Sequence, residues 1–356
     1  MSRNMLLLGD GEVRELLNVC EAVKLVEQVF RDKNLGRIQN PMKTYLVYDR
    51  YNGDHRFMPA YIEGLDVAGV KIVNTHPENR RKFGLPTVSG IIVLLNPEDG
   101  RILSIMDATW ITAVKTAAAS AVATKYLGRD DSEVFGLVGA GLQAVAHVDA
   151  FTCSTSISEV RVWSRTRRTV RRFLELMSER HPELRFVEAG EVAEAVRDCD
   201  VVTTLTPSRR PIVAADWISP GTHINAMGSD ARGKHELEPE ILRMAKVVVD
   251  DLEHCSLTGE INVALSKGLM TKEDVYAEIG EIILGEKPGR TSRDEVTVFA
   301  STGIAAQDVA VAYSVYKRAV EKGFGLNVDV SGPTMELVRQ LSQRPLHMAK
   351  KVQKIE

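Results

Sequence analysis

The feature that most constrains this fold is a glycine turn between a short apolar strand and a helix. Val134–Val138 is typical of a buried strand, Gly139-Ala-Gly141-Leu-Gln-Ala144 follows it, and helical spacing continues to about Cys153. In such a GxGxxA turn, the first glycine permits a tight bend, the second lets backbone amides approach a diphosphate, and the alanine lets helix and strand pack closely. The helix N-terminus also favours negative charge. Because a second strand, Glu159–Trp163, follows at the expected distance, we expect a dinucleotide site, with a structural glycine turn as the alternative.

Strands and helices alternate through the rest of residues 131–300. Further strands are expected at Arg185–Val187, Val201–Leu205, Thr222–Ala226 and Lys246–Val249, and helices at Thr166–Arg180 and around Val192–Val196. This alternation is typical of βαβ units, whose parallel strands form a doubly wound sheet. We therefore expect a Rossmann dinucleotide-binding domain over residues 123–304.

The first 130 residues show a different pattern, in which hairpins link the strands. Asn52-Gly53, a dipeptide that favours a type I′ turn, lies between strands at Lys43–Tyr48 and Arg56–Tyr61. Further elements are expected as strands at Met5–Leu8, Val67–Val73, Val88–Asn96 and Ile102–Met106, and as helices at Cys20–Phe30, Ala108–Leu127 and Ala305–Lys322. We expect an α/β protein whose second domain, residues 1–122 with 305–356, is an antiparallel sheet or open barrel.

The C-terminal tail, from Gly325 to Glu356, carries one weaker signal. Leu337, Val338 and Leu341 have the spacing of a short amphipathic helix, which could cap a domain or contact a second subunit. A partly ordered tail is the alternative.

Composition and residue spacing argue against several classes of function. Lys plus Arg total 45 and Asp plus Glu total 48, so the formal net charge is −3, which argues against a nucleic-acid binder. The longest aliphatic run, Ile91 to Leu95, is too short to cross a bilayer, and the N-terminus lacks the apolar length of a signal peptide. The histidines show no metal-ligand spacing, and the cysteines form no CxxC motif. We therefore expect a cytoplasmic protein with no metal site, no membrane or nucleic-acid partner, and four reduced thiols: Cys20, Cys153, Cys199 and Cys255.

The end of the second nucleotide-domain strand indicates which nicotinamide cofactor fits. An Asp or Glu there would bind the ribose hydroxyls of NAD. This chain has Ser164-Arg165-Thr166-Arg167-Arg168 instead, and hydroxyl and guanidinium groups suit a 2′-phosphate. We therefore expect NADP(H) in preference to NAD(H), bound by Arg165 with Ser164 or Thr166. The alternative is that the arginines between Arg165 and Arg172 form only a solvated helix face.

Four basic residues outside the nucleotide domain are candidates for holding an anion: Lys43, Arg56, Lys71 and Lys115. Lys71 lies in an apolar strand, where a buried ammonium group is costly unless it meets an anion. Lys115 lies in an otherwise apolar helix and precedes small residues that allow close approach. Ordinary surface charge is an adequate alternative for Arg56 and Lys43, and a poorer one for Lys71 and Lys115.

An aspartate is expected at the carboxyl edge of the parallel sheet. Thr222–Asp230 runs off the end of a strand, and ligands of open α/β sheets bind beyond the carboxyl ends of their strands. Asp230 is therefore placed to meet a substrate amine or a water, with a helix-cap role as the alternative. Thr206-Pro-Ser208, which follows the preceding strand, should lie on the same rim.

Many of these motifs together resemble one known family, the ornithine cyclodeaminase/mu-crystallin family, and within it most closely the archaeal-type alanine dehydrogenases. The resemblance spans roughly residues 1–325 and leaves the tail outside. The matching segments are Arg56–Tyr61, Val70–His76, Gly84–Val88, Met106–Ala108, Lys115–Ala118, Gly139–Gln143, His223–Ala226, Gly228–Asp230, Gly259–Val263, Ser301–Gly303 and Gln307-Asp308. The resemblance implies an antiparallel, dimer-forming substrate domain beside a Rossmann domain.

The resemblance also implies roles for the charged residues. Lys71 would contact the substrate carboxylate, and Lys43 stands where alanine dehydrogenases carry Lys and other branches carry Arg. Arg56 stands where cyclodeaminases have a Glu for the substrate amine, so a second amino group on the substrate would be repelled. Lys115 replaces the family's usual Arg, which keeps the charge but loses the bidentate fork. Asp230 matches the acid that cyclodeaminases use toward the amine, and would orient the amine, imine or water and act as general acid or base.

We therefore expect an NAD(P)-dependent oxidoreductase that interconverts a small L-amino acid and its imine or keto acid, with Lys71 and Asp230 as its catalytic residues. It would resemble an alanine dehydrogenase or a ketimine (pyrroline-2-carboxylate) reductase, and would be a homodimer. The alternatives are an ornithine cyclodeaminase, which forms proline and ammonia, and a non-catalytic NADPH- or ligand-binding protein like mu-crystallin. The expected cofactor contacts are Thr116, Gly139, Gly141, Leu142, Gln143, Ser164, Arg165, Thr166, Thr206, Ser208, Met227 and Ser301.

Overall fold

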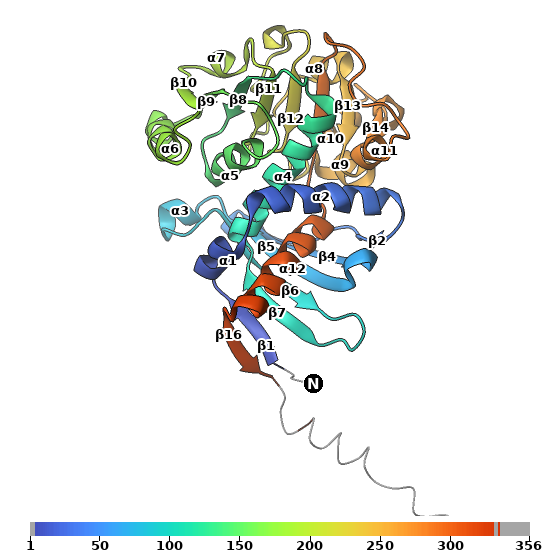
Figure 1. Ribbon diagram of the computed structural model, residues 1–356. Coiled ribbons are helices and arrows are strands. Elements are labelled where there is room, and N and C mark those ends of the chain that lie inside the picture. Colours follow the sequence, from blue (N-terminus) through green and yellow to red (C-terminus); the bar gives the residue numbers. More distant parts are fainter. Residues whose placement is uncertain (1–3, 331–333, 335–356) are drawn as a thin grey trace, which may run out of the picture.

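The computed structural model describes residues 4–330 and Thr334, and places them in two units, each built on an eight-stranded sheet. Figure 1 shows the unit of sheet A below and the unit of sheet B above, with α2 (Val19–Asn34) crossing between them. The expected helix around Leu337, Val338 and Leu341 lies outside the described residues.

Sheet A is formed by the N-terminal part of the chain and one late strand. Its order is β16-β1-β7-β6-β5-β4-β2, with β3 paired to β4 off this path. The pairs are antiparallel, as we expected, except β1–β7, which is parallel, so the sheet is mixed. Its strands are β1 (Asn4–Leu8), β2 (Ile38–Gln39), β3 (Thr44–Tyr48), β4 (Gly53–Ile62), β5 (Val67–Thr75), β6 (Val88–Leu95), β7 (Ile102–Asp107) and β16 (Leu326–Asp329).

The β3–β4 hairpin forms as predicted, but its turn differs from the expected type I′ geometry. Asp49–Tyr51 makes a 3-10 turn, and only Asn52 has a left-handed backbone, with φ of 46°. A type I′ turn needs positive φ at two central residues, and Gly53 already belongs to β4. Gly53 is required for another reason: a Cβ there would lie 2.3 Å from the His76 ring.

Sheet B is wholly parallel, in the order β10-β9-β8-β11-β12-β15-β13-β14, which confirms the doubly wound fold. Strand order reverses between β8 and β11, which is where ligands of such sheets bind. β14 and β15 are absent from the sequence-based expectation. The strands are β8 (Val134–Val138), β9 (Glu159–Trp163), β10 (Arg185–Glu188), β11 (Val201–Thr204), β12 (His223–Ala226), β13 (Lys246–Val249), β14 (Ala277–Glu278) and β15 (Thr297–Ala300).

Helices cover both sheets and join the two units. α12 packs on β4, β5 and β6, so the chain returns to sheet A after β15, and α4 packs against α2 on one side and α5 on the other. The predicted boundary at residue 122 falls inside α4. The remaining helices are α1 (Asp10–Leu16), α3 (Asn79–Lys82), α4 (Thr109–Leu127), α5 (Leu142–Phe151), α6 (Arg167–Arg180), α7 (Val192–Val196), α8 (Pro239–Met244), α9 (Leu252–Thr258), α10 (Asn262–Ser266), α11 (Ile279–Ile283) and α12 (Ala305–Lys322).

One covalent bond between the units corrects the expectation of four reduced thiols. Cys20, exposed near the start of α2, forms a disulfide with Cys153, which follows α5. Cys199 and Cys255 are free and buried. The two bonded cysteines are 133 positions apart, so no local spacing motif could reveal them. Only the fold brings α2 against the end of α5.

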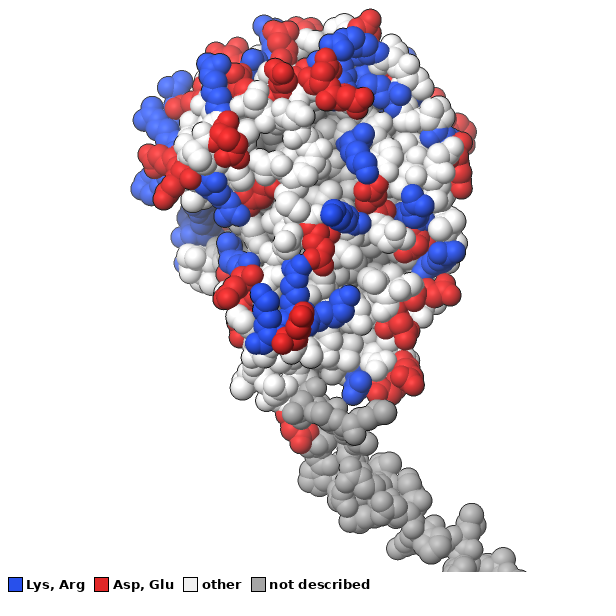
Figure 2. All heavy atoms as spheres, in the orientation of Figure 1, with Lys and Arg blue, Asp and Glu red and all other residues white. Residues whose placement is uncertain are grey.

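The surface carries mixed charge. Figure 2 shows Lys and Arg side chains interspersed with Asp and Glu over the visible face, without one sign dominating. Across residues 4–330, no helix is long and apolar enough to cross a membrane. The same residues contain no group of three His, Cys, Asp or Glu side chains arranged to hold a metal ion.

Candidate active site

The predicted glycine turn connects β8 to α5 and leaves its outer side open. Gly139 has φ of +130°, a conformation that side chains strongly disfavour, and its amide donates to the Trp163 carbonyl at 2.8 Å. Gly141 is the N-cap of α5 and makes no side-chain cap; a Cβ there would meet nothing within 4 Å. Ala144 is fully buried against the sheet. The uncapped amides of the first turn, which includes half-exposed Gln143 and exposed Leu142, fit a diphosphate.

A buried glutamate ties together two loops at the carboxyl edge of sheet B. Glu236 accepts the Thr206 amide at 2.7 Å through Oε1 and the Gly228 amide at 3.0 Å through Oε2. Burial and the neighbouring Glu260 raise the pKa of Glu236 to about 8. Thr206 therefore lies on the same rim as Met227 and Asp230, as we expected.

Other predicted cofactor contacts sit on this rim or beside it. Ser301, directly after β15, is buried and its hydroxyl donates to Asp250 at 2.7 Å. Ser208 is half-buried and donates to the Arg210 carbonyl at 2.6 Å. Met227 is buried directly after β12, and Thr116 is half-buried on α4 beside Lys115.

The segment after β9 is exposed and cationic. Arg165 and Thr166 are exposed, and Ser164 is half-buried. Among the residues that the structure describes, Arg165 makes no hydrogen bond or ion pair. Arg171 further along α6 pairs with Glu188 at 3.5 Å, as an ordinary surface residue does.

Three lysines of the sheet A unit, two of them buried and one half-buried, meet one segment that returns from sheet B. Lys71 on β5 donates to Asp308 Oδ1 at 2.8 Å, and Lys115 on α4 donates to Gln307 Oε1 at 3.2 Å. Lys43, just before β3, donates to the Thr302 carbonyl at 2.7 Å. Lys71, Lys115 and Asp308 are all nearly inaccessible to solvent. The segment from β15 into α12 therefore gathers ammonium groups from three different elements.

Arg56 and Asp230 connect the two sheets. Arg56 Nη1, on β4, donates to Asp230 Oδ2 at 2.5 Å, and its Nε donates to Asp54 at 2.9 Å. Lys234 donates to the other oxygen of Asp230 at 2.5 Å. The helix-cap alternative for Asp230 is wrong, because its carboxylate binds these two cations and the next helix begins at Pro239 with Glu238 as its N-cap. Arg56 is also not an ordinary surface charge, since only 6% of it is exposed.

The cluster perturbs the protonation of its members. Burial lowers the pKa of Lys71 to about 7 against the opposing effect of Asp308, and burial and Lys115 lower the pKa of Lys43 to about 8. Burial would raise the pKa of Asp230, but Arg56 and Lys234 hold it well below its usual range. Asp230 is therefore a permanent carboxylate at neutral pH, which does not suit a general acid.

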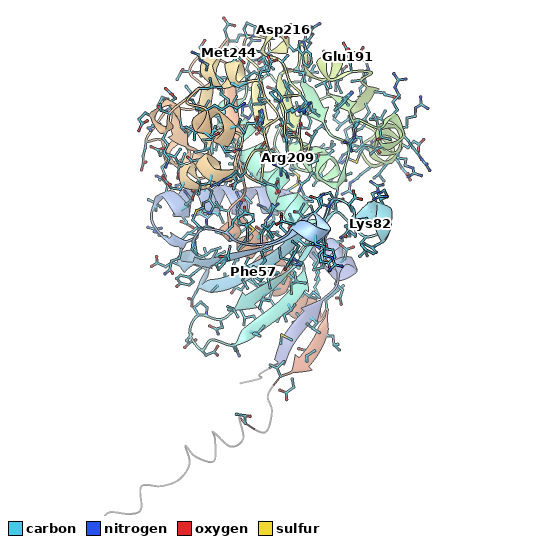
Figure 3. All side chains as sticks on the ribbon, turned by 180° about the vertical axis from the view of Figure 1, so that it is seen from behind. Phe57, Lys82, Glu191, Arg209, Asp216 and Met244 are labelled. Atoms are coloured by element: carbon cyan, nitrogen blue, oxygen red, sulfur yellow. A yellow bond between two sulfur atoms is a disulfide. The ribbon has the colours of Figure 1, made fainter. Side chains whose placement is uncertain are left out.

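Several charged residues that help to build this site were missed as site residues from the sequence: Asp54, Lys234, Glu236, Asp250 and Asp308. Of these, only Asp308 had a sequence signal, because it belongs to a segment that carries the family resemblance. The others are ordinary acidic or basic residues until folding brings them beside an ion of opposite sign or, for Glu236, beside two backbone amides. Figure 3 shows the protein from behind, with Lys82 of α3 beside the junction of the two units and Phe57 on sheet A.

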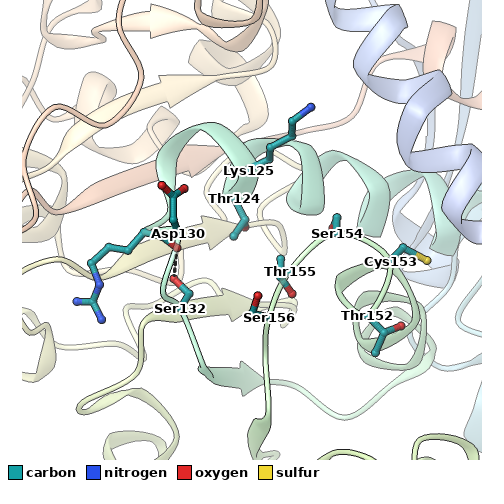
Figure 4. Close-up of a pocket in the computed structure, with 10 residues that line it drawn as sticks. Thr124, Lys125, Asp130, Ser132, Thr152, Cys153, Ser154, Thr155 and Ser156 are labelled. Atoms are coloured by element: carbon teal, nitrogen blue, oxygen red, sulfur yellow. Dashed lines mark hydrogen bonds between the residues drawn. The ribbon is translucent and has the colours of Figure 1, made fainter.

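A cavity of about 420 Å³ lies elsewhere, between the end of α4 and the segment after α5 (Figure 4). It is lined mainly by hydroxyl and charged side chains, including Thr124, Lys125, Ser132 and Ser156. Ser132 and Ser156 precede β8 and β9, so the cavity lies at the amino edge of these strands. The glycine turn and Arg165 lie at their carboxyl edge. The cavity is therefore separate from the predicted site.

Comparisons with known proteins show to which family this fold belongs. The model of the ornithine cyclodeaminase/mu-crystallin family matches residues 3–323. Alanine dehydrogenase from Archaeoglobus fulgidus is 46% identical over 323 residues, which are 91% of this chain and 98% of that protein. A solved archaeal alanine dehydrogenase dimer with bound NAD has a TM-score of 0.87 and 45% identity, covering 92% of this chain and 100% of its own. Delta(1)-pyrroline-2-carboxylate reductase from Thermococcus litoralis, solved with NADH and L-proline, has a TM-score of 0.89 and 35% identity, covering 91% and 100%. The chain therefore belongs to the ornithine cyclodeaminase/mu-crystallin family, as its motifs predicted.

Proposed function

We propose that this protein is a nicotinamide-dependent oxidoreductase that interconverts a small L-amino acid and its imine or keto acid. Alanine with pyruvate and ammonia, and proline with pyrroline-2-carboxylate, are the proposed substrate pairs. Relatives with 46% and 32% identity carry these two activities in their names. Both reactions need a carboxylate held beside the nicotinamide site.

The observation that carries this proposal is a cluster of buried and half-buried cations at the junction of the two sheets. The cations are Lys43, Arg56, Lys71, Lys115 and Lys234; the carboxylates that face them are Asp54, Asp230, Asp250 and Asp308. Lys43 and Lys115 make their hydrogen bonds to neutral oxygens. Ammonium groups that meet only neutral oxygens are costly to bury, and a substrate carboxylate would give them an anionic partner.

In this mechanism, a bound nicotinamide cofactor supplies the hydride-transfer chemistry. The chain's residues position the reactants. Lys71, Lys115 and Arg56 bind and orient the carboxylate, and placing it well is worth several kcal/mol of barrier. Lys43, with a pKa of about 8, can hold or release a proton at Nζ near neutral pH. Asp230 stays ionised and orients the substrate amine, imine or a water.

The same geometry speaks against a diamino acid substrate such as ornithine. Both oxygens of Asp230 are already engaged, by Arg56 and by Lys234. Asp54 is engaged by Arg56, and Asp308 by Lys71. At Asp230, a second substrate ammonium group would therefore meet Arg56 and Lys234 instead of a free carboxylate, so cyclodeamination is not the function that we propose.

For the cofactor, we propose NADP(H) in preference to NAD(H), bound by Arg165 with Ser164 and Thr166. The support is an exposed guanidinium beside two hydroxyls, and the absence of a carboxylate in the segment that directly follows β9. The remaining expected contacts on α4, α5 and the rim of sheet B form the rest of this proposed cofactor site.

We also propose a homodimer that buries the outer face of sheet A. One face of the sheet packs on α12, whereas the other presents half-exposed or exposed apolar side chains. A groove of about 470 Å³ there is lined by Leu7, Ile91, Ile105 and Leu326. Ile91 is 41% exposed, which is unusual for an isoleucine in a central strand. A second copy of the same face is a fitting partner, because one solved relative is a dimer.

We place this enzyme in the cytoplasm, where nicotinamide cofactors and small amino acids are available. Fractionation of cells, followed by mass spectrometry of the peptides that contain Cys20 and Cys153, should find this protein in the cytoplasmic fraction. Recovery of the protein only outside the cytoplasm contradicts the assignment.

The function is tested by measuring NADPH and NADH oxidation with pyruvate plus ammonia, and separately with pyrroline-2-carboxylate. We expect turnover with at least one of these substrates. Release of ammonia and proline from ornithine, without net cofactor oxidation, would instead identify a cyclodeaminase. Tight cofactor binding without turnover of any amino acid or imine would indicate a non-catalytic binding protein.

A further inference from the structure

We propose that Asp308 is a positioning residue of the active site, which holds Lys71 and Lys115 together in place as a pair of ammonium groups for the substrate carboxylate. The inference rests on the proposed function and extends it to a residue that lies on the helix α12. Asp308 acts through the two lysines and need not touch the substrate itself.

The geometry gives one carboxylate to two buried cations. Asp308 Oδ1 accepts from Lys71 Nζ at 2.8 Å, and Oδ2 lies 3.7 Å from Lys115 Nζ. Lys71 comes from β5 and Lys115 from α4, so Asp308 joins three separate elements. Oδ2 is buried and makes no hydrogen bond among the described residues. The separation of Oδ2 from Lys115 shows that this second pairing is loose, so Lys115 retains donor capacity for another anion.

The turn before α12 aims this carboxylate. Ser301 and the Gly303 amide are both bound to Asp250, at 2.7 and 2.8 Å, which fixes the bend between β15 and α12. Gly303 has φ of +72°, and a Cβ there would lie 2.2 Å from Lys115 Nζ. A glycine is therefore required at this point, because any side chain would displace the ammonium group.

Charge explains why the two lysines need Asp308. Lys115 and Lys43 both oppose the charge on Lys71, and burial opposes it more strongly; Asp308 is the group that favours it. Replacing the carboxylate with a neutral amide of the same shape would leave Lys71 and Lys115 with only neutral hydrogen-bond partners. Without this carboxylate we expect the pKa of Lys71 to fall, because a nearby opposite charge typically shifts a pKa by about one unit or more. At a fixed pH above this pKa, one unit corresponds to about a tenfold loss in affinity for a substrate carboxylate. A neutral Lys71 would bind a carboxylate poorly.

Asp308→Asn tests the proposal, with Ser314→Ala as the matched control. Ser314 lies on the same helix, is buried and bonds only to the Val311 carbonyl, outside the cluster. Two quantities are measured across a range of pH: the affinity of the cofactor complex for oxamate, a carboxylate that does not react, and the affinity for NADPH alone. Both are read from the fluorescence of bound NADPH. Neither needs turnover, so the test stands even if the substrates that we propose are wrong.

We expect D308N to weaken oxamate binding about tenfold near neutral pH and to move the pH above which binding is lost down by about one unit. NADPH affinity should change less than about twofold, as in S314A. Oxamate binding within twofold of wild type at every pH would overturn the proposal. If D308N does not fold, Asp308→Glu carries the test. This variant keeps the negative charge, so the pH above which oxamate binding is lost should be the same as in the wild type. A fall in that pH by about one unit or more would contradict the proposal.

Discussion

Removing the Cys20–Cys153 disulfide should lower the stability of the whole molecule by a calculable amount. The bond closes a chain segment of 133 residues. In the chain-entropy model, a loop of this length restricts the unfolded state by about 5 kcal/mol, whereas measured values are more often about 2–4 kcal/mol. With an unfolding entropy of about 2.1 cal/mol/K per residue, these energies correspond to a fall in melting temperature of about 3–7 °C for this chain.

Two variants and a reductant make the assay specific. Cys20→Ser should lower the melting temperature by this amount, and dithiothreitol should then have no further effect. Cys199→Ser is the matched control, because Cys199 is a free, buried thiol. Whatever its own stability, its melting temperature should still fall on reduction. The cysteines lie away from the lysine cluster, so activity at 25 °C should be unchanged.

Two results would refute this reasoning. Thiol titration of the unfolded, unreduced protein should detect two free thiols, and detection of four would mean that the bond does not form. A wild-type melting temperature that is the same with and without reductant would mean that the bond forms but does not restrain the chain.

Three further predictions concern the site. Gly228→Ala should destabilise the protein by about 1–3 kcal/mol and weaken cofactor binding, since its Cβ would lie 2.3 Å from the Thr206 carbonyl oxygen. Gly11→Ala, where a Cβ would meet nothing within 4 Å, should do neither, and equal melting curves for the two variants would contradict this prediction. Arg165→Ser should lower kcat/KM for NADPH at least about tenfold and leave NADH nearly unchanged, with Arg172→Ser as control; equal losses for both cofactors would remove Arg165 from the 2′-phosphate site. The KM for an anionic substrate should rise as the pH increases through about 7 to 8, because Lys71 and Lys43 are cations only below their pKa values of about 7 and about 8. A KM that stays constant from about pH 6 to 9 would exclude both lysines from carboxylate binding.

The parts of the fold that could be predicted are those with local sequence signals. β8, β9, α7, β13 and α12 have the bounds that we expected, because apolar runs, glycine turns and helical spacing mark them. β14 has only two residues, and β15 follows a long irregular segment, so neither produces a clear pattern. The parallel pairing of β1 with β7 is non-local, and no signal within either strand reveals it.

The site was predictable to a similar extent. Lys71 and Lys115 stood out because an ammonium group within an apolar segment needs an explanation. Their partner Asp308 was marked only by the family resemblance, because an aspartate in the first turn of a helix is otherwise common and stabilising there. Its burial follows from the return of α12 to sheet A, which depends on the whole fold. The disulfide was missed for the same reason.

The central claim is that buried cations of the sheet A unit hold a carboxylate beside the cofactor edge of sheet B. A crystal structure of the complex with NADPH and oxamate tests it most directly. We predict carboxylate oxygens within hydrogen-bond distance of Lys71 Nζ, and the diphosphate against the amides that follow Gly141. Oxamate bound in the cavity beside Thr124 and Ser156, with the lysine cluster unchanged, would contradict the account.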